Sequence, residues 1–471
     1  MVRKFKKAFN GRPLPSEAWR LDMEVEAAGP AFSEDLLRLY YARLFPYEQF
    51  CEWLAYEPAD AGARSKLERS SAASSSAAAL ENETSTLARR EFSFTLDGDV
   101  YIRYQCFADA TQMKAAMTKR QPVKIDIGAV FNTIPSDHLS TPNFRPEERE
   151  LVFDIDLSDY DDVRTCCKGA TVCKKCWKFM TAAIRVVDAT LRDDFGFEHI
   201  MWVYSGRRGV HCWVGDRAAR ALTNEARSAV VAYFAVVHGS ENNAQKLALT
   251  WPLHPALQRA YDILEPIFAE HIVGEHGQRL LADPALWASV LKTLPEDIGA
   301  KVGAHWDRSD KSSTPRQKWE ALKSLSDTPA AAGGTGTAKK QKRANGVNEL
   351  WKYETVFTYC YPRLDENVSK QRNHLLKSPF AAHPKTGRIC LPLDASKCDD
   401  FDPTTVPTLR DLAAQIDAHT ATDAHTPDLD KTELKASVML FKRSFVDPIR
   451  KSLAKERRAR TERQNAHNAD F

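Results

Sequence analysis

Along residues 150–157 every second position is Leu, Phe or Ile, and these alternate with Val152, Asp154 and Asp156. A period of two predicts a β-strand with one apolar face. Asp154 and Asp156 stand between the apolar positions, so their side chains project from the same face, roughly 7 Å apart along the strand. Two carboxylates this close repel each other unless a cation lies between them. The strand is therefore either a solvated acidic face or one wall of a divalent-metal site.

A period near 3.6 predicts helices on both sides of this strand. Residues 33–44 and 47–56 are two such stretches, and Ser33 is placed to cap the first. Residues 177–195 form the longest clear pattern, and Gly196 follows it as expected at the C-terminal end of a helix. Helices therefore flank the acidic strand in the sequence.

Short alternating stretches joined by glycine-containing turns predict two β-hairpins. The first joins residues 91–96 to 100–104 through Asp-Gly-Asp, and the second joins 199–204 to 210–214 through Ser-Gly-Arg-Arg-Gly. Residues 124–128 add a further strand. Helices and hairpins together predict a mixed α/β fold with mixed β-sheets flanked by helices.

Changes in composition divide the chain. Residues 1–31 lack a clear period and are predicted to be a loose lead-in. Residues 57–88, rich in Ala and Ser, are predicted to be a flexible insertion, and residues 328–346 a linker. The predicted organisation is an α/β region over 32–216, a helical subdomain with its linker over 217–346, a second α/β part over 347–410, and a helical basic segment over 411–471.

Bulk composition narrows the class of protein. Of the 471 residues, 43% are hydrophobic and 27% are charged, as in ordinary soluble proteins with two or three domains. A net charge of +3 means that nucleic acid would be bound through a local patch rather than a global field. We find no signal peptide and no stretch that could span a membrane, so we expect a reducing compartment where the ten cysteines are thiols or metal ligands.

Four cysteines lie within eleven residues: Cys166, Cys167, Cys173 and Cys176. This density, ending in a Cys-x-x-Cys pair, is typical of a closed tetrahedral Zn²⁺ site without an open catalytic position. Buried free thiols or a redox-active pair are the alternatives. Because the cluster begins ten residues after Asp156, we expect it to brace the loop that leaves the acidic strand.

The turn of the second hairpin has the chemistry of a phosphate site. Its backbone N–H groups, with Ser205, Arg207 and Arg208, would present donors in one direction. Guanidinium groups bind phosphate oxygens bidentately, and His211 could add a further donor. A surface hairpin with solvated arginines is the other reading.

Two further groups of residues are weak evidence for a site when each is taken alone. Asp365 could complete a metal site with the acidic strand, and Lys377 and His383 could reach phosphates. On the first hairpin, Tyr101 and Arg103 face one side and could contact phosphate and sugar, together with Glu91 and Asp126; otherwise these residues belong to a strand pair of mixed burial. In combination, the groups indicate metal-dependent nucleotidyl transfer.

Three motifs carry a family resemblance: Phe-Asp-Ile-Asp at 153–156, Ser-Gly-Arg-Arg-Gly-Val-His at 205–211 and His-Leu-Leu-Lys-Ser-Pro-Phe at 374–380. With them, the sequence resembles the small catalytic subunit of eukaryotic DNA primase over 32–56, 90–128, 150–214 and 359–407. The resemblance implies a primase-type catalytic fold over the two α/β parts, with a zinc knuckle at 166–176 and an inserted helical subdomain.

The resemblance also implies roles for individual residues. Asp154, Asp156 and Asp365 would hold catalytic Mg²⁺ or Mn²⁺, and the four cysteines would hold structural Zn²⁺. The incoming nucleotide's phosphates would be contacted by Arg103, Ser205, Arg207, Arg208, His211, Lys377 and His383, with His374 in the same motif. Glu91, counted with the catalytic residues, would lie near the sugar and base together with Tyr101 and Asp126.

The activity implied is synthesis of short RNA primers from ribonucleoside triphosphates on a single-stranded DNA template, for initiation of replication in the nucleus. The implied partners are a large iron–sulfur primase subunit, in a heterodimer, and the DNA polymerase α assembly. The six remaining cysteines are scattered, so we expect no iron–sulfur cluster in this chain. Alternatives are a related polymerase that extends with deoxynucleotides in repair or damage tolerance, and a non-catalytic zinc-braced scaffold. The basic C-terminal run could contact template, form a solvated helical face or serve in nuclear localisation.

Overall fold

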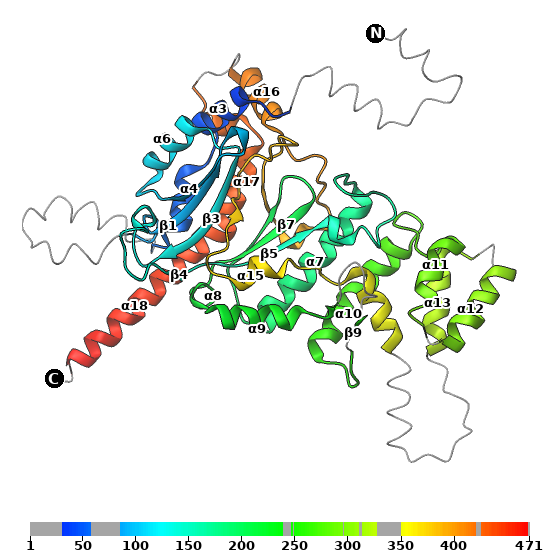
Figure 1. Ribbon diagram of the computed structural model, residues 1–471. Helices are drawn as coiled ribbons and strands as arrows, with labels where there is room; N and C mark the ends of the chain where they lie inside the picture. The colour runs from blue at the N-terminus through cyan, green and yellow to red at the C-terminus, as the bar shows by residue number, and fades with distance from the viewer. Residues whose placement is uncertain are drawn as a thin grey trace, which may run out of the picture.

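The computed structural model of the protein describes residues 31–57, 85–238, 246–247, 249–294, 296–309, 313–326, 350–420 and 425–469. Two antiparallel β-sheets lie at its centre, with helices packed around them (Figure 1). This arrangement confirms the predicted mixed α/β fold. The predicted lead-in over 1–31, insertion over 57–88 and linker over 328–346 fall almost entirely outside the described residues.

The first sheet has the strand order β10-β3-β1-β2, with β4 also paired to β3. Its strands are β1 Arg90–Thr95, β2 Tyr101–Gln105, β3 Lys124–Phe131, β4 Pro146–Glu148 and β10 Leu376–Lys377. Three helices accompany it (Figure 1): α3 Glu34–Arg43, α4 Tyr47–Ala55 and α6 Ala110–Arg120. Helix α3 begins at the predicted cap, since the Ser33 side chain accepts a hydrogen bond from the Leu36 N–H. The sheet thus joins the predicted first hairpin to a strand from late in the chain.

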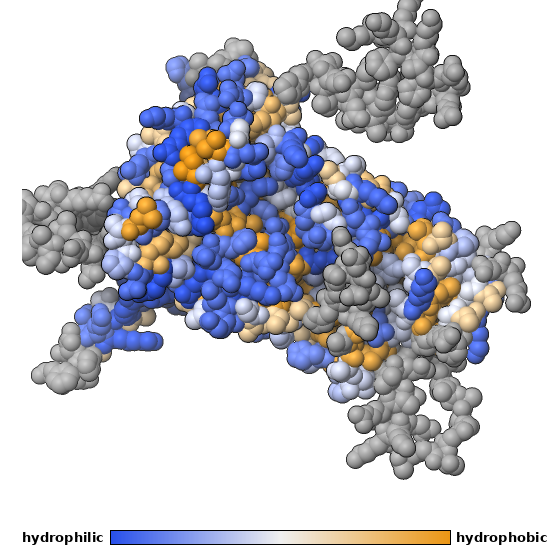
Figure 2. Space-filling model, viewed as in Figure 1, coloured by the Kyte–Doolittle hydropathy of each residue, from blue (hydrophilic) through white to orange (hydrophobic). Residues whose placement is uncertain are grey.

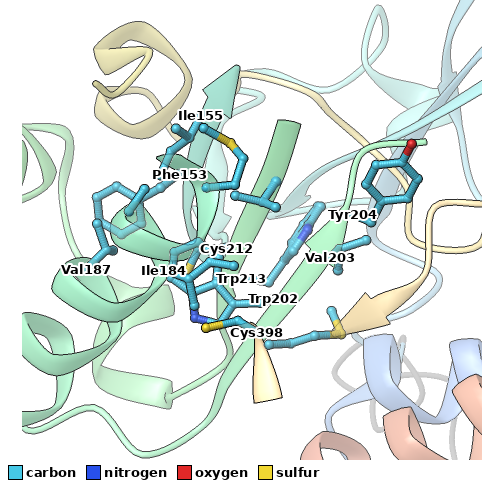
Figure 3. Close-up of a cluster of buried hydrophobic side chains, with 14 of the residues drawn as sticks. Phe153, Ile155, Ile184, Val187, Trp202, Val203, Tyr204, Cys212, Trp213 and Cys398 are labelled. Carbon is cyan, nitrogen blue, oxygen red and sulfur yellow. The ribbon is translucent and has the colours of Figure 1, made fainter. Parts of the chain in front are cut away.

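The second sheet has the order β11-β6-β7-β5. Its strands are β5 Leu151–Asp156, β6 Ile200–Tyr204, β7 Gly209–Val214 and β11 Pro392–Leu393. Helix α7, Lys174–Asp193, supplies twelve buried side chains, and Figure 3 shows two of them, Ile184 and Val187, gathered with side chains of the strands. Gly196, with a φ of 67°, ends this helix as predicted, and its N–H donates to the Arg192 carbonyl. The acidic strand, second hairpin and long helix therefore form one unit.

The two sheets are fixed to each other by aromatic and ionic contacts. Trp53 of α4 lies 5.5 Å from Trp213 of β7 between ring centroids, edge to face. Arg90 of β1 makes two hydrogen bonds of 2.9 Å with the Glu150 carboxylate at the start of β5, and both side chains are fully buried. A buried charge pair is costly to break once formed, so the relative position of the sheets is well defined.

Helices make up most of the remaining chain. The helical subdomain, here residues 217–326, contains α8 Arg217–Ala221, α9 Asn224–Phe234, α10 Pro255–Ile267, the π-helix η5 Phe268–Val273, α11 Pro284–Leu291, α12 Glu296–Ser309 and α13 Pro315–Ser326. A two-stranded sheet within it, β8 Val237–His238 with β9 Lys246–Leu247, was not predicted. Helix α10 packs against α7, which joins this subdomain to the second sheet (Figure 1).

The C-terminal part returns to both sheets and then leaves them. Its helices, after a helical stretch over 350–360, are α15 Glu366–Lys370, α16 Leu409–Thr420, α17 Leu434–Phe441, the π-helix η8 Lys442–Val446 and α18 Asp447–Ala469. Short 3₁₀ turns elsewhere are η2 Asp97–Asp99, η3 Pro135–Asp137, η4 Leu157–Tyr160, η6 Ala395–Lys397 and η7 Asp428–Lys431. The end of α18 projects from the body, and its visible surface is hydrophilic (Figures 1 and 2). No helix among those described is both long and apolar enough to cross a membrane.

Candidate active site

The acidic strand and Asp365 meet through the backbone. In β5, Asp154 pairs with His211 of β7, and Asp156 pairs with Gly209. The Asp365 N–H donates to the Asp154 carbonyl at 3.0 Å. Asp365 also caps α15, where its carboxylate accepts from the Asn367 N–H. The local cap and this long-range bond together hold a third carboxylate beside the first two.

The electrostatics of Asp154 reflect this crowding. Burial raises the pKa of Asp154 to about 7, with further upward contributions from the Asp156 and Asp365 carboxylates. Burial and Asp156 also raise the pKa of Asp159 to about 6. Carboxylates that repel each other are stabilised by a cation. The face therefore favours the binding of positive charge.

Asp156 is held by the arginine hairpin. Arg208 Nε lies 2.8 Å from its carboxylate, and the Ser158 N–H and Oγ both donate to the same group at 2.8 Å. Gly209 allows the hairpin to come this close, because a Cβ there would lie 2.4 Å from the Ile155 carbonyl oxygen. Gly206, at a φ of 85°, provides the turn itself. The two glycines thus place the Arg208 guanidinium over the acidic strand.

Lys377 connects the two sheets at this point. It belongs to β10 of the first sheet, and its Nζ donates to the Ser205 carbonyl in the hairpin of the second sheet at 3.1 Å. Burial and Lys377 lower the pKa of His211 to about 3. The same two causes, with Arg207, Lys385 and Arg208, lower the pKa of His383 to about 3. Both imidazoles are therefore neutral at pH 7. His383 lies among several cations, whereas His211 lies near Lys377, with its Nε2 at 3.5 Å from the Asp154 carboxylate.

The first sheet presents a polar face. Arg103 donates to both oxygens of the buried Glu91 carboxylate, at 2.8 and 3.1 Å. Asp126 lies opposite Ser93 on β1 and opposite Lys377 on β10, and it accepts from Ser93 Oγ at 3.0 Å. Residues directly opposite in an antiparallel pair share a face, so Asp126 and Lys377 project from the same side of the sheet.

Two of the predicted site residues, Tyr101 and His374, are tied to the other site residues less closely than the rest. Tyr101 on β2 is 52% exposed. His374 contributes its main-chain carbonyl, which accepts from the Arg149 guanidinium, while burial and Arg149 lower the pKa of its imidazole. The predictions missed Arg149 and Ser158, which hold neighbouring groups, and Asp159. Asp159 continues the acidic run of residues 154–159, so the sequence carried a signal for it.

The three aspartates suit a hard divalent cation, because Mg²⁺ and Mn²⁺ prefer carboxylate oxygens. Burial, and then the neighbouring Asp156 and Asp365 carboxylates, raise the pKa of Asp154, which is what a donor set without its cation would show. Their oxygens do not all converge within 4.8 Å, as the atoms of a preformed three-ligand site among the described residues would. Ion binding would therefore require small side-chain movements, including release of Asp156 from Arg208.

The four cysteines do converge. Their sulfur atoms all lie within 4.8 Å of one another, with Cys166 and Cys173 at 3.6 Å and Cys173 and Cys176 at 3.9 Å. Tetrahedral bonds of about 2.3 Å to zinc place sulfur atoms roughly 3.8 Å apart. The cluster is thus compatible with structural zinc. Cys176 is buried at the start of α7, so the cluster anchors the helix that covers the second sheet.

Comparisons with known proteins place the chain in one family. Residues 153–395 match the family described as DNA primase small subunit. The DNA primase small subunit of Drosophila melanogaster is 40% identical over 84% of each chain. That of Schizosaccharomyces pombe is 36% identical over 85% of this chain and 82% of its own. That of Saccharomyces cerevisiae is 31% identical over 95% of this chain and 99% of its own.

Proposed function

Because the chain belongs to the family of DNA primase small subunits, we propose that it is a primase subunit that makes short RNA primers from ribonucleoside triphosphates on single-stranded DNA. The observation that carries this proposal is the bond from the Asp365 N–H to the Asp154 carbonyl. It brings a third carboxylate to the acidic strand, opposite the cations of the hairpin and of β10. An active site for nucleotidyl transfer needs carboxylates that bind the metal ions and cations that bind the phosphates.

In this proposal Asp154, Asp156 and Asp365 hold two Mg²⁺ or Mn²⁺ ions. When bound, such ions activate the attacking 3′-hydroxyl and stabilise the charge of the leaving pyrophosphate. Arg207, Arg208 and Lys377 bind the triphosphate. Arg208 would exchange its bond with Asp156 for one with a phosphate oxygen, so that nucleotide binding frees the carboxylate for the ion.

Neutral imidazoles and the polar face complete the nucleotide site. His211 and His383, which burial and nearby cations keep uncharged, donate hydrogen bonds to phosphate without adding positive charge. Arg103, fixed by Glu91, presents its remaining N–H groups toward the substrate. Asp126, Tyr101 and His374 line the sugar and base side. We further propose that the subunit works in the nucleus with a large iron–sulfur subunit and the DNA polymerase α assembly.

The direct test is incorporation of nucleotides on single-stranded DNA with Mn²⁺, with and without a large primase subunit. We expect short RNA products from ribonucleotides and much less product from deoxynucleotides alone. Efficient extension by deoxynucleotides would favour a repair polymerase instead. A scaffold would give no product, no divalent-dependent nucleotide affinity and single-strand binding that is unchanged by Asp156→Ala.

Metal affinity should depend on pH because Asp154 must lose a proton to bind the ion. With its pKa at about 7, Mn²⁺ affinity should rise about tenfold per pH unit below pH 7 and level off above it. The raised pKa also means that the metal-free fold gains stability from this group below pH 4 and loses it as the pH rises through 7. Titration with Mn²⁺ by electron paramagnetic resonance checks the profile, and Asp154→Asn should flatten it. A pH-independent affinity in the parent protein would contradict the assignment.

A further inference from the structure

The zinc knuckle, residues 166–176, is bonded to the helical subdomain through one buried side chain. Gln278 is 2% exposed and lies in the segment that follows η5. Its Oε1 accepts from the Thr165 N–H at 2.6 Å and from the Cys166 N–H at 3.2 Å. Thr165 Oγ1 donates in return to the Gln278 carbonyl at 2.7 Å. Three donors at residues 165–166 and two acceptors of Gln278 are thus paired with each other.

The same amide also reaches a cysteine sulfur. Gln278 Nε2 lies 3.2 Å from Cys166 Sγ, within the distance of an N–H···S hydrogen bond. A donor in this position stabilises thiolate rather than thiol and fixes the direction of the sulfur lone pairs. Hydrogen bonds of this kind tune metal ligands, and their removal typically lowers metal affinity by 10–100-fold.

Gln278 is itself anchored in the helical subdomain. Its N–H donates to the His271 carbonyl at 2.9 Å, and the Leu280 N–H donates to the Ile272 carbonyl at 3.0 Å. Both acceptors belong to η5, whose Phe268 ring lies 4.8 Å from the Trp319 ring of α13. A shift of the helical subdomain would therefore displace Gln278.

On its other side the knuckle is bonded to the end of the acidic strand. Buried Arg164 donates to the Thr171 carbonyl at 3.1 Å and the Gly169 carbonyl at 2.7 Å, and it pairs with Asp161. Asp161 also accepts from the Gly169 N–H at 2.8 Å. Asp161 directly follows η4, which continues from β5. The knuckle therefore lies between the acidic strand and the helical subdomain, bonded to both.

We propose that Gln278 is an outer-shell positioning residue for Cys166, and that the metal-loaded knuckle is the clasp that fixes the helical subdomain to the second sheet. The proposal rests on the zinc site and not on primer synthesis. It predicts two separable effects: loss of the amide weakens metal binding, and loss of the metal loosens the subdomain.

The first effect is tested with Gln278→Leu, which removes the amide at similar volume, in a competition between the full chain and a chromophoric zinc chelator. We expect 10–100-fold weaker zinc binding and, after cobalt substitution, a shifted thiolate-to-cobalt charge-transfer band. Thr165→Val is the matched control, because it removes the bond to the Gln278 carbonyl and leaves Nε2 on the sulfur. Parent-like affinity and spectrum in Gln278→Leu would overturn the outer-shell role.

The second effect is tested by hydrogen exchange on the parent protein before and after zinc removal. Exchange should become faster at residues 268–282 as well as within the knuckle. Faster exchange confined to the knuckle would overturn the clasp. This measurement needs no variant, so it decides the question even if Gln278→Leu does not fold, and neither test requires the chain to be active.

Discussion

Replacing Asp154 with Asn is expected to lower primer synthesis by about a thousandfold or more, because the change removes a charged ligand of the proposed metal site at the reacting centre. The fold should persist. The main-chain carbonyl of residue 154 still accepts from the Asp365 N–H. The neutral amide also avoids both causes of the raised pKa of Asp154, namely burial of its charge and repulsion from Asp156 and Asp365. In EDTA at pH 8 the variant should melt at the same temperature as the parent protein or higher, whereas the stabilisation of the parent by Mn²⁺ should be lost.

Asp35→Asn provides the control for this variant. Its side chain is 91% exposed and lies in the first turn of α3, where it pairs with Arg38 at 3.4 Å. We expect no measurable change in synthesis or in Mn²⁺ binding. Asp365→Asn should behave like Asp154→Asn, since asparagine keeps the cap of α15 and removes the charge. Synthesis within tenfold of the parent in either site variant would remove that residue from the proposed metal site.

Replacing Cys176 with Ser is expected to cause the largest loss of stability. Cys176 is buried at the first turn of α7, so removal of its sulfur opens the cluster and leaves a polar hydroxyl beside the core. Binding of structural zinc is worth on the order of 10 kcal/mol in small domains, and part of it is folding free energy here. Metal analysis should fall from about one zinc per chain, and the melting temperature should fall with it.

Cys106→Ser is the corresponding control, because Cys106 is a partly exposed free thiol outside the cluster. The Cys106→Ser variant should keep the zinc content and the melting temperature of the parent protein. Mild chelation of the parent protein should likewise lower stability before catalytic metal binding is affected. If Cys176→Ser keeps both its zinc and its melting temperature, the four cysteines are ordinary thiols.

Local patterns predicted the elements that carry their own signal. The acidic strand, both hairpins and α7 were predicted because the signal for each lies within the element or directly beside it: the spacing of apolar residues, the residues of the turns, and Gly196 after α7. Helix α6 was missed because only Met113 and Met117 of its side chains are buried. Such a narrow apolar face gives little periodicity.

The sequence predicted which residues belong to the candidate site, but it did not predict which of them contact each other. The motifs indicated Asp365 and Lys377. Nothing in the sequence indicates the hydrogen bonds from Lys377 to the Ser205 carbonyl or from Arg208 to the Asp156 carboxylate. Gln278 could not be found at all, since its partners lie 112 and 113 residues away and its neighbours in the chain form no motif. Contacts of this kind arise from tertiary packing rather than from local sequence.

The dependence of the acidic strand on α15 has a consequence for biosynthesis. Ser369 Oγ donates to the Val152 carbonyl at 2.6 Å across a separation of 217 residues, next to the bond between Asp365 and Asp154. At translation rates of about 5–20 residues per second, roughly 10–40 seconds pass between synthesis of the two segments. During that time a nascent chain can pair β5 with β7, but it lacks the third carboxylate. We therefore expect ribosome-bound chains to bind template and nucleotide poorly, and catalytic competence to arise in one late step.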